Sequence, residues 1–314
     1  MRSSPDRGPL DREPLACLTA ALRGVGQVGL QPHLLTGAFI LAGPWVAGWQ
    51  VGLFATLGTL VSTASARALG VDRASVSQGL QGYSGCLTGI ALVGSLGHHP
   101  ATYLLTAVGG VLCTVLTAAL ATLLGPHGLT PRTAPFCVVA GVTLLGASSF
   151  ARFRPGLPAP VAAPADDTGL TSSDLWHAFF TNVSQVFLVD NWYVGLIMLA
   201  CAGVRVVLWA ALGSVAGILA AWALGAPAAQ VAAGIHGYDA VLVGLALGAV
   251  FLADTPWNAG YALFGAALST GLTAAVTSFA EPFGGRTFTW PFILTTWALL
   301  AAVPRLPRLR AATA

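Results

Sequence analysis

The sequence predicts an all-α integral membrane protein made of two homologous halves that run in opposite directions across the bilayer. Three observations lead to this fold class: an apolar composition, a clustering of charged residues, and a duplicated set of polar residues. Of 314 residues, 55% are hydrophobic and only 8% are charged, and the mean hydropathy is +0.77. An ordinary soluble domain carries about 25% charged residues. A soluble fold could not bury this much apolar side chain, so the composition excludes one.

Charged residues gather near the two ends of the chain and near its middle. No Asp, Glu, Lys or Arg stands between positions 74 and 131, whereas arginines flank both termini. Arginine beside an apolar span is typical of the cytoplasmic side, so both termini are expected in the cytoplasm. The net charge of +3 belongs to these flanks and indicates no nucleic-acid partner. All 14 basic residues are arginine, which favours a GC-rich bacterial genome and hence the inner (plasma) membrane.

Apolar stretches predict the membrane-embedded segments. They fall at 34–48, 51–69, 86–97, 101–124 and 134–150, and then at 187–203, 204–224, 239–253, 257–279 and 290–303. A spanning helix needs about 20 apolar residues, and the stretches that begin at 86 and 239 hold only about a dozen. Short, glycine-broken apolar segments at matching places in two halves are typical of re-entrant half-helices. The apolar stretches that begin at 86 and 239 are therefore expected to be a pair of re-entrant segments, one in each half.

A stretch rich in proline, alanine and polar residues separates the halves and predicts a linker outside the membrane. The expected division of the chain is a polar tail (1–15), a first repeat (16–151), a linker (152–174), a second repeat (175–303) and a basic tail (304–314). An odd number of spans in each half, with both termini on one side, inverts the second repeat. Arg152 and Arg154 fit an external linker poorly, whereas Asp166, Asp167 and Asp174 are compatible with it.

The duplication is visible in paired segments about 155 residues apart. "GLQGYSGCLTGIAL" (79–92) and "GIHGYDAVLVGLAL" (234–247) share the pairs Gly79/Gly234, Gly82/Gly237, Tyr83/Tyr238, Leu87/Leu242, Gly89/Gly244, Ala91/Ala246 and Leu92/Leu247. The pattern continues in Gln27/Gln185 and Gly37/Gly195, each 158 positions apart, and in Thr133/Thr289 and Pro135/Pro291, each 156 positions apart. Matched landmarks at such similar offsets indicate a tandem duplication.

The duplicated polar residues are glutamine, threonine and tyrosine, all of them neutral. Burying such a side chain in hydrocarbon costs a few kcal/mol of free energy unless it forms a hydrogen bond. Beside a pore, its oxygen could instead accept hydrogen bonds from a solute. Each tyrosine stands four residues before a leucine, on the same helix face, and such a pair could form a flat apolar wall. Two copies suit a small, planar, neutral molecule with several N–H donors.

Each residue alone also has a more ordinary interpretation. A glutamine or threonine in a membrane helix often bonds a neighbouring helix, and a tyrosine often lies at the membrane interface. The matched offsets favour a functional role for the set as a whole. Asp190, Asn191 and Asp239 suit helix caps better than a proton relay, which leaves their contribution to a pore open. His236, which aligns with Gln81 in the duplication, suits a hydrogen-bonding role better than a catalytic one.

At these segments the chain resembles the urea transporter family. The resemblance rests on "GLQGYSGCLTG" and "GIHGYDAVLVG", on the two glutamine segments that end at Gly37 and Gly195, and on "TAPF" and "TWPF". It implies a homotrimer in membrane lipid, in which each duplicated protomer has its own channel for urea. It also implies that each half contains about five transmembrane helices and one re-entrant segment, with the pore between the halves. By position, it implies a selectivity filter with Gln27 and Gln185 at the two ends, Thr133 and Thr289 at the centre, and Tyr83, Leu87, Tyr238 and Leu242 along the walls.

The chain also departs from the family pattern. Leu30 and Leu188 stand where family members often carry phenylalanine, and Ser84 and Asp239 stand where asparagine is common. More aliphatic walls extend the expected substrates from urea to small amide analogues. Because the duplicated polar residues are neutral, we expect passive flux without ion coupling.

Other functions were weighed against the urea channel. In the same class, a channel for water or ammonia would also be neutral. A water channel would need paired Asn-Pro-Ala boxes, and none occurs in the sequence; an ammonia channel would need a pair of histidines within the spans, and the histidines mostly fall in expected loops. In a different class, a membrane-embedded enzyme would need a nucleophile–base pair, and neither G-x-S-x-G nor H-E-x-x-H is present. Five cysteines without CxxC or metal-ligand spacing predict no disulfide, metal or cofactor. The sequence therefore predicts a transporter and not an enzyme.

Overall fold

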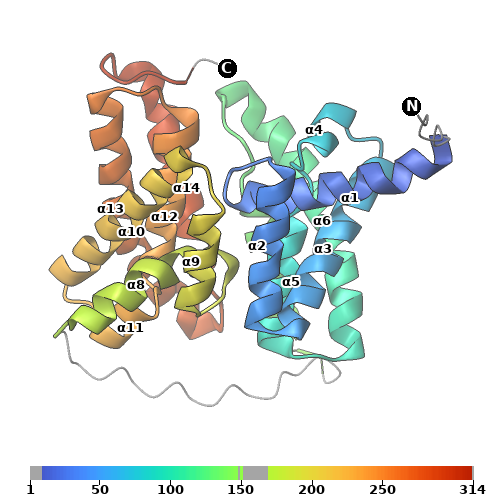
Figure 1. The fold of residues 1–314 in the computed structure, drawn as a ribbon, viewed down its shortest axis with the longest axis horizontal. Coiled ribbons are helices and arrows are strands. Elements are labelled where there is room, and N and C mark those ends of the chain that lie inside the picture. Colours follow the sequence, from blue (N-terminus) through green and yellow to red (C-terminus); the bar gives the residue numbers. More distant parts are fainter. Residues whose placement is uncertain (1–8, 148, 151–168, 313–314) are drawn as a thin grey trace, which may run out of the picture.

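The structure is a computed structural model that describes residues 9–147, 149–150 and 169–312. Throughout this part of the chain the regular secondary structure is helical, apart from one isolated antiparallel bridge between Leu252 and Ala311. Figure 1 shows two bundles side by side, one coloured blue to green and one yellow to red. Contacts between α2 and α9, and between α7 and α14, join the two bundles.

The two halves contain the same order of long and short helices. The first half has α1 (Pro9–Val28), α2 (Leu34–Ala47), α3 (Trp49–Ala68), α4 (Arg73–Ser77), α5 (Tyr83–Leu96), α6 (Pro100–Leu124), η1 (Gly125–His127) and α7 (Ala134–Ala147). The second half has α8 (Ser172–Ser184), η3 (Gln185–Phe187), α9 (Trp192–Ala200), α10 (Val204–Ala223), α11 (Ala228–Ala232), α12 (Tyr238–Gly244), the π-helical η4 (Leu245–Phe251), α13 (Pro256–Ala280), η5 (Glu281–Phe283), α14 (Trp290–Ala302) and η6 (Val303–Arg305). In Figure 1, α4 lies at the upper end of one bundle and α11 at the lower end of the other.

Three of the described helices are long and apolar enough to cross a membrane alone: Pro100–His127, Val204–Ala223 and Pro256–Phe283. A fourth span is possible from Ser172–Phe187 and Trp192–Ala200, which meet at a bend of 79°. By length and composition, fewer helices therefore qualify as membrane spans than the sequence predicts. The reason is that several apolar stretches fold as helices of only 10–17 residues. The break at Gly48, between α2 and α3, falls where the sequence already separates the apolar stretches 34–48 and 51–69.

Two helices begin earlier than the expected division of the chain. α1 begins at Pro9, inside the expected tail, and α8 begins at Ser172, inside the expected linker. α8 begins there because Thr171 and Asp174 form a capping box. The Thr171 side chain accepts from the Asp174 N–H at 3.2 Å, and the Asp174 carboxylate accepts from the Thr171 N–H at 2.8 Å. The linker residues 151–168, with Arg152, Arg154, Asp166 and Asp167, lie outside the described residues.

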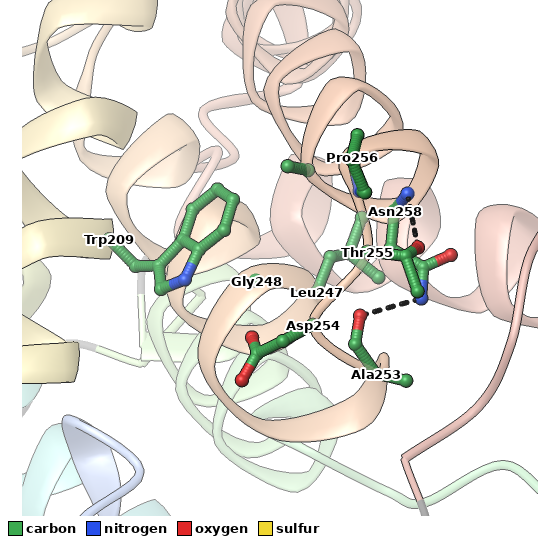
Figure 2. A pocket seen from close by; sticks show the side chains of 9 residues that line it. Trp209, Leu247, Gly248, Ala253, Asp254, Thr255, Pro256 and Asn258 are labelled. Carbon is green, nitrogen blue, oxygen red and sulfur yellow. Dashed lines mark hydrogen bonds between the residues drawn. The ribbon is translucent and has the colours of Figure 1, made fainter.

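The C-terminal segment packs against the loop that precedes α13. Ala253 N donates to the carbonyl of Arg310 at 3.0 Å, and the Asn258 amide donates to the same carbonyl at 2.8 Å and to the Ala253 carbonyl at 2.7 Å. Figure 2 shows Asn258 pointing toward Ala253, beside a cavity of about 260 Å³ that contains none of the predicted site residues. Ala312 N also donates to the carbonyl of Phe251, at 2.9 Å. The chain end therefore fixes the end of η4.

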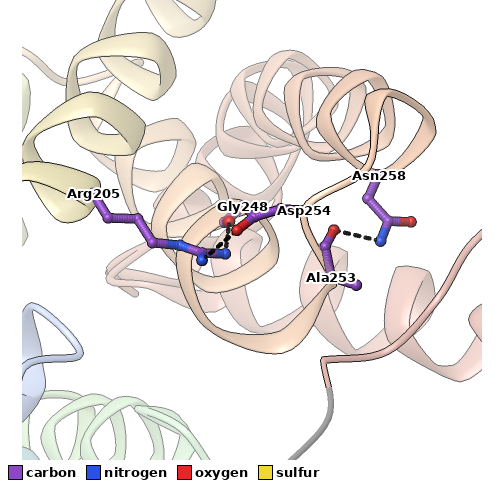
Figure 3. A network of polar contacts seen from close by, with 5 residues as sticks. All are labelled: Arg205, Gly248, Ala253, Asp254 and Asn258. Carbon is purple, nitrogen blue, oxygen red and sulfur yellow. Dashed lines mark hydrogen bonds and ion pairs between the residues drawn. The ribbon is translucent and has the colours of Figure 1, made fainter.

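An ion pair fixes the same loop from the side of α10. Arg205 Nη1 lies 2.7 Å from Asp254 Oδ2, and Arg205 Nη2 donates to the carbonyl of Gly248 at 3.1 Å (Figure 3). Both charged side chains are partly exposed, so the pair contributes about 0–1 kcal/mol and acts mainly to position the loop.

Two of the paired glycines permit equivalent helix contacts. A Cβ atom at Gly37 would lie 1.8 Å from the carbonyl oxygen of Leu22, and one at Gly195 would lie 1.9 Å from that of Phe180. The first contact joins α2 to α1, and the second joins α9 to α8. Because any side chain would push these helices apart, glycine is required at both positions.

Candidate functional site

Thr133 and Thr289 meet where the two bundles join. Their hydroxyl oxygens lie 2.7 Å apart and form a hydrogen bond across 156 positions of sequence. Both side chains are buried, and each directly precedes a short apolar helix, α7 or α14. Cys137, in the first turn of α7, places its sulfur 3.2 Å from Thr289 Oγ1. The duplicated threonines thus form a neutral polar contact in the buried region between the two halves.

The two tyrosines hold the turns that present these threonines. Arg132 and Phe288, the residues just before the threonines, have left-handed backbone conformations with φ of 51° and 43°. Such values are uncommon for residues other than glycine and need support from their surroundings. Tyr83 Oη donates to the carbonyl of Arg132 at 2.7 Å, and Tyr238 Oη donates to the carbonyl of Phe288 at 2.6 Å. The sequence predicted the tyrosines as walls and did not predict this positioning role.

The two glutamines are anchored in equivalent ways. Gln27 Nε2 donates to the carbonyl of Gln78 at 2.9 Å, and Gln185 Nε2 donates to the carbonyl of Ala233 at 3.0 Å. A carbonyl only accepts, so the amide nitrogen must face it and the amide oxygen must point elsewhere. Each glutamine therefore offers an oxygen acceptor beside its anchor.

Two cavities reach the chain beside the threonines, one lined by Thr133 and the other by Phe288, the residue before Thr289. The first cavity, of about 420 Å³, is lined by Gln27, Leu30, Tyr83, Arg132 and Thr133, together with Phe251 and Phe292 from the second half. The second cavity, of about 650 Å³, is lined by Gln185, Leu188, Tyr238 and Phe288, together with Ile90 and Ser95 from the first half. Each cavity is thus built from both halves, and the two cavities share no lining residue.

Three predicted site residues line neither cavity. Leu87 and Leu242 are 1% and 2% exposed and belong to the apolar core, and Thr289 is 1% exposed. The structure therefore brings seven of the ten predicted residues to the two cavities and places the other three in the packed region. We infer that side chains must move there for a solute to pass between the cavities.

Asp239 caps the first turn of α14. Its carboxylate accepts from Phe292 N at 3.2 Å and from the Thr273 hydroxyl at 2.9 Å, and it is fully buried. Phe292 N lies in the first turn of α14, where an N–H has no partner within the helix. A helix-capping role was predicted without naming the helix, and the structure shows that Asp239 caps α14. Asp239 lines neither cavity.

The other polar residues near the repeats have local partners. Asn191 caps α9, with its side-chain oxygen 3.4 Å from Val194 N. His236 Nε2 lies 2.8 Å from Gln230 Oε1, which is a hydrogen-bonding role. Asp190 is exposed. None of the three lines either cavity.

Arg132 is the site residue that the sequence analysis missed. Its side chain is 6% exposed, lines the first cavity, and lies with Cζ 4.1 Å from the centroid of the Phe251 ring. One signal in the sequence could have identified it. Arg132 is the first charged residue after the uncharged run 74–131 and stands directly before Thr133.

Known proteins similar in sequence to this chain belong to one family. The family model described as urea transporter matches residues 18–304. Over 299 residues, the chain is 31% identical to urea transporter 1 of Ovis aries and of Capra hircus, and 30% identical to that of Rattus norvegicus. Each alignment covers 92% of this chain and 77% of the relative. Together with the apolar helices, these matches indicate a multi-pass membrane protein that acts in transport and not as an enzyme. The chain belongs to the urea transporter family.

Proposed function

We propose that this chain is a passive channel for urea and small amide analogues in the inner membrane. The observation that carries the proposal is the 2.7 Å contact between the Thr133 and Thr289 hydroxyls, with a glutamine-lined cavity on each side. The path runs from one cavity to the other through this contact. Gln27 and Gln185 stand at its two ends.

The chemistry of the path suits a neutral amide. Urea has four N–H donors and one carbonyl, all hydrogen-bonded to water before it enters. A filter must replace those bonds without creating a deep well. The amide oxygens of Gln27 and Gln185 and the hydroxyls of Thr133 and Thr289 are acceptors for the donors. When urea enters, the threonines exchange their mutual hydrogen bond for bonds to urea, so the bond is replaced and not lost.

Apolar side chains select for a flat solute. Tyr83, Leu30 and Leu87 on one side, and their counterparts Tyr238, Leu188 and Leu242 on the other, form the walls of the slot in this proposal. Because Leu87 and Leu242 are nearly fully buried, the slot opens only to the thickness of a planar molecule. No carboxylate is among the residues proposed for the slot, so a hydrated cation would lose its water there without a charged partner, at a large energetic cost.

The two halves act as inverted repeats in this proposal. Support comes from α6 and α13, which each have 25 residues at matching places, and from the opposite placement of α4 and α11 in Figure 1. We assign each half five membrane-crossing segments and one re-entrant segment, with both termini in the cytoplasm. The homotrimer implied by the family resemblance belongs to the same proposal, and native mass spectrometry of the solubilised protein measures it.

Flux measurements in proteoliposomes test the passive mechanism. We expect urea flux to be unchanged by membrane potential and by proton or sodium gradients, because no charged group of either cavity is duplicated. The measurement compares urea efflux with and without an imposed potential or gradient in the same preparation. Flux that depends on any of these gradients would contradict a channel and indicate coupled transport.

A further inference from the structure

Arg132 places a buried positive charge at the first cavity. The side chain is 6% exposed, and within the described part of the chain neither Nε nor Nη1 has a hydrogen-bond partner. No aspartate or glutamate is among the residues that line this cavity. A buried guanidinium normally pairs with an anion or with several acceptors, since its burial is otherwise costly. The unpaired donors therefore require a partner that the chain itself does not supply.

The protein compensates the charge only in part. The guanidinium carbon lies 4.1 Å from the centroid of the Phe251 ring and 5.7 Å from that of the Phe292 ring. These cation–π contacts provide no hydrogen bond, so the N–H groups at Nε and Nη1 stay without a partner. Phe251 is held by the C-terminal segment through the bond from Ala312 N. The arginine is thus positioned beside the cavity with its hydrogen-bonding edges unused.

The second cavity lacks an equivalent group. Phe288 occupies the position that corresponds to Arg132, and the charges that line the second cavity are Glu281 and Arg286, both exposed and of opposite sign. α7 begins directly after Thr133, so the positive end of its helix dipole adds to the arginine charge, whereas the equivalent end of α14 is capped by the Asp239 carboxylate. Only the first cavity therefore has an unbalanced positive potential.

We propose that Arg132 makes the first cavity a binding site for a small planar carboxylate, such as formate or acetate, which blocks urea at the threonine contact. A guanidinium matches a carboxylate because its N–H donors lie in one plane and can engage two oxygens. The cavity, of about 420 Å³, has room for such an anion beside Thr133, and Leu30 and Val28 offer apolar surface to a methyl group. The blocking effect rests on the proposed urea channel, whereas binding of the anion does not.

Equilibrium dialysis with radiolabelled acetate tests binding without any transport. Purified wild-type protein is expected to bind acetate saturably, and Arg132→Leu is expected to lose that binding. Leucine is suitable because Leu30 and Leu188 already adopt positive φ in this chain, as position 132 requires. If the Arg132→Leu variant does not elute as a single species in gel filtration, the Arg132→Gln variant is used in its place. Arg286→Leu, which removes an exposed arginine from the other cavity, is the matched control and should bind acetate as the wild type does.

Urea efflux from proteoliposomes then tests the block. Acetate is expected to reduce wild-type efflux severalfold, and the ratio of efflux with and without acetate should be one for Arg132→Leu. Absence of saturable acetate binding, binding that survives in Arg132→Leu, or wild-type efflux that acetate does not reduce would each overturn the proposal. A protein that binds acetate but carries no urea in acetate-free buffer would instead contradict the proposed function.

Discussion

Replacement of Thr289 by valine is expected to reduce urea flux roughly tenfold or more while the protein still folds and inserts. Valine has nearly the shape of threonine but no hydroxyl, so the contact with Thr133 and the acceptor for urea are lost together. A donor left unpaired inside a protein costs about 1–3 kcal/mol, and each ~1.4 kcal/mol corresponds to a factor of ten in rate. The measurement is urea efflux from proteoliposomes at matched protein density.

Thr296 provides the matched control on the same helix. It is fully buried, and its hydroxyl donates to the carbonyl of Phe292, at 2.7 Å, within α14. Because this bond lies inside the helix and Thr296 itself lines neither cavity, Thr296→Val should leave flux close to that of the wild type. Wild-type flux in Thr289→Val, or an equal loss in both variants, would remove the threonine contact from the path.

Replacement of Gly195 by alanine is expected to destabilise the protein by about 1–3 kcal/mol or more, which is the usual cost of overpacking. The new Cβ would lie 1.9 Å from the carbonyl oxygen of Phe180, a backbone atom that cannot rotate away. α9 would have to separate from α8, and Gln185, at the end of α8, would move with it. Thermal unfolding in detergent, followed by gel-filtration profile, measures the effect.

Replacement of Gly260 by alanine is expected to have the opposite effect on stability. It lies in α13, is exposed, and would place a Cβ with no atom within 4 Å. Alanine there should stabilise the helix by about 0.4–1 kcal/mol, because it restricts the unfolded chain and favours helix. Equal melting temperatures for Gly195→Ala and Gly260→Ala would show that the α8–α9 contact is looser than the structure indicates.

The sequence predicted the landmarks of the site because the duplication made them visible. An isolated Gln27 or Thr133 has several ordinary explanations, but a second copy at a matching offset argues for a shared role. The helical, membrane-embedded character of the fold followed from composition alone. The family resemblance, confirmed by the match over residues 18–304, added which polar residues to examine.

The contacts across the two halves could not be predicted in this way. Periodicity shows which face of a helix a residue occupies, but it does not show what lies opposite. The hydrogen bonds from Tyr83 and Tyr238 to the backbone just before the threonines depend on the packing of separate helices. Arg132 was missed for another reason: an arginine near an apolar stretch is normally a solvated flank, and only the folded chain shows it buried.

A reversible crosslink between positions 133 and 289 tests the central claim most directly. Cysteines in place of Thr133 and Thr289, in a Cys137→Ala background, would place their sulfur atoms where the hydroxyl oxygens now lie 2.7 Å apart, near the ~2.05 Å of a disulfide bond. Cys137 is removed because its sulfur lies 3.2 Å from Thr289 Oγ1. If urea passes between the two halves at this contact, oxidation should abolish its flux in proteoliposomes and reduction should restore it. A protein shown by mass spectrometry to be crosslinked, yet carrying urea as fast as its reduced form, would contradict the account.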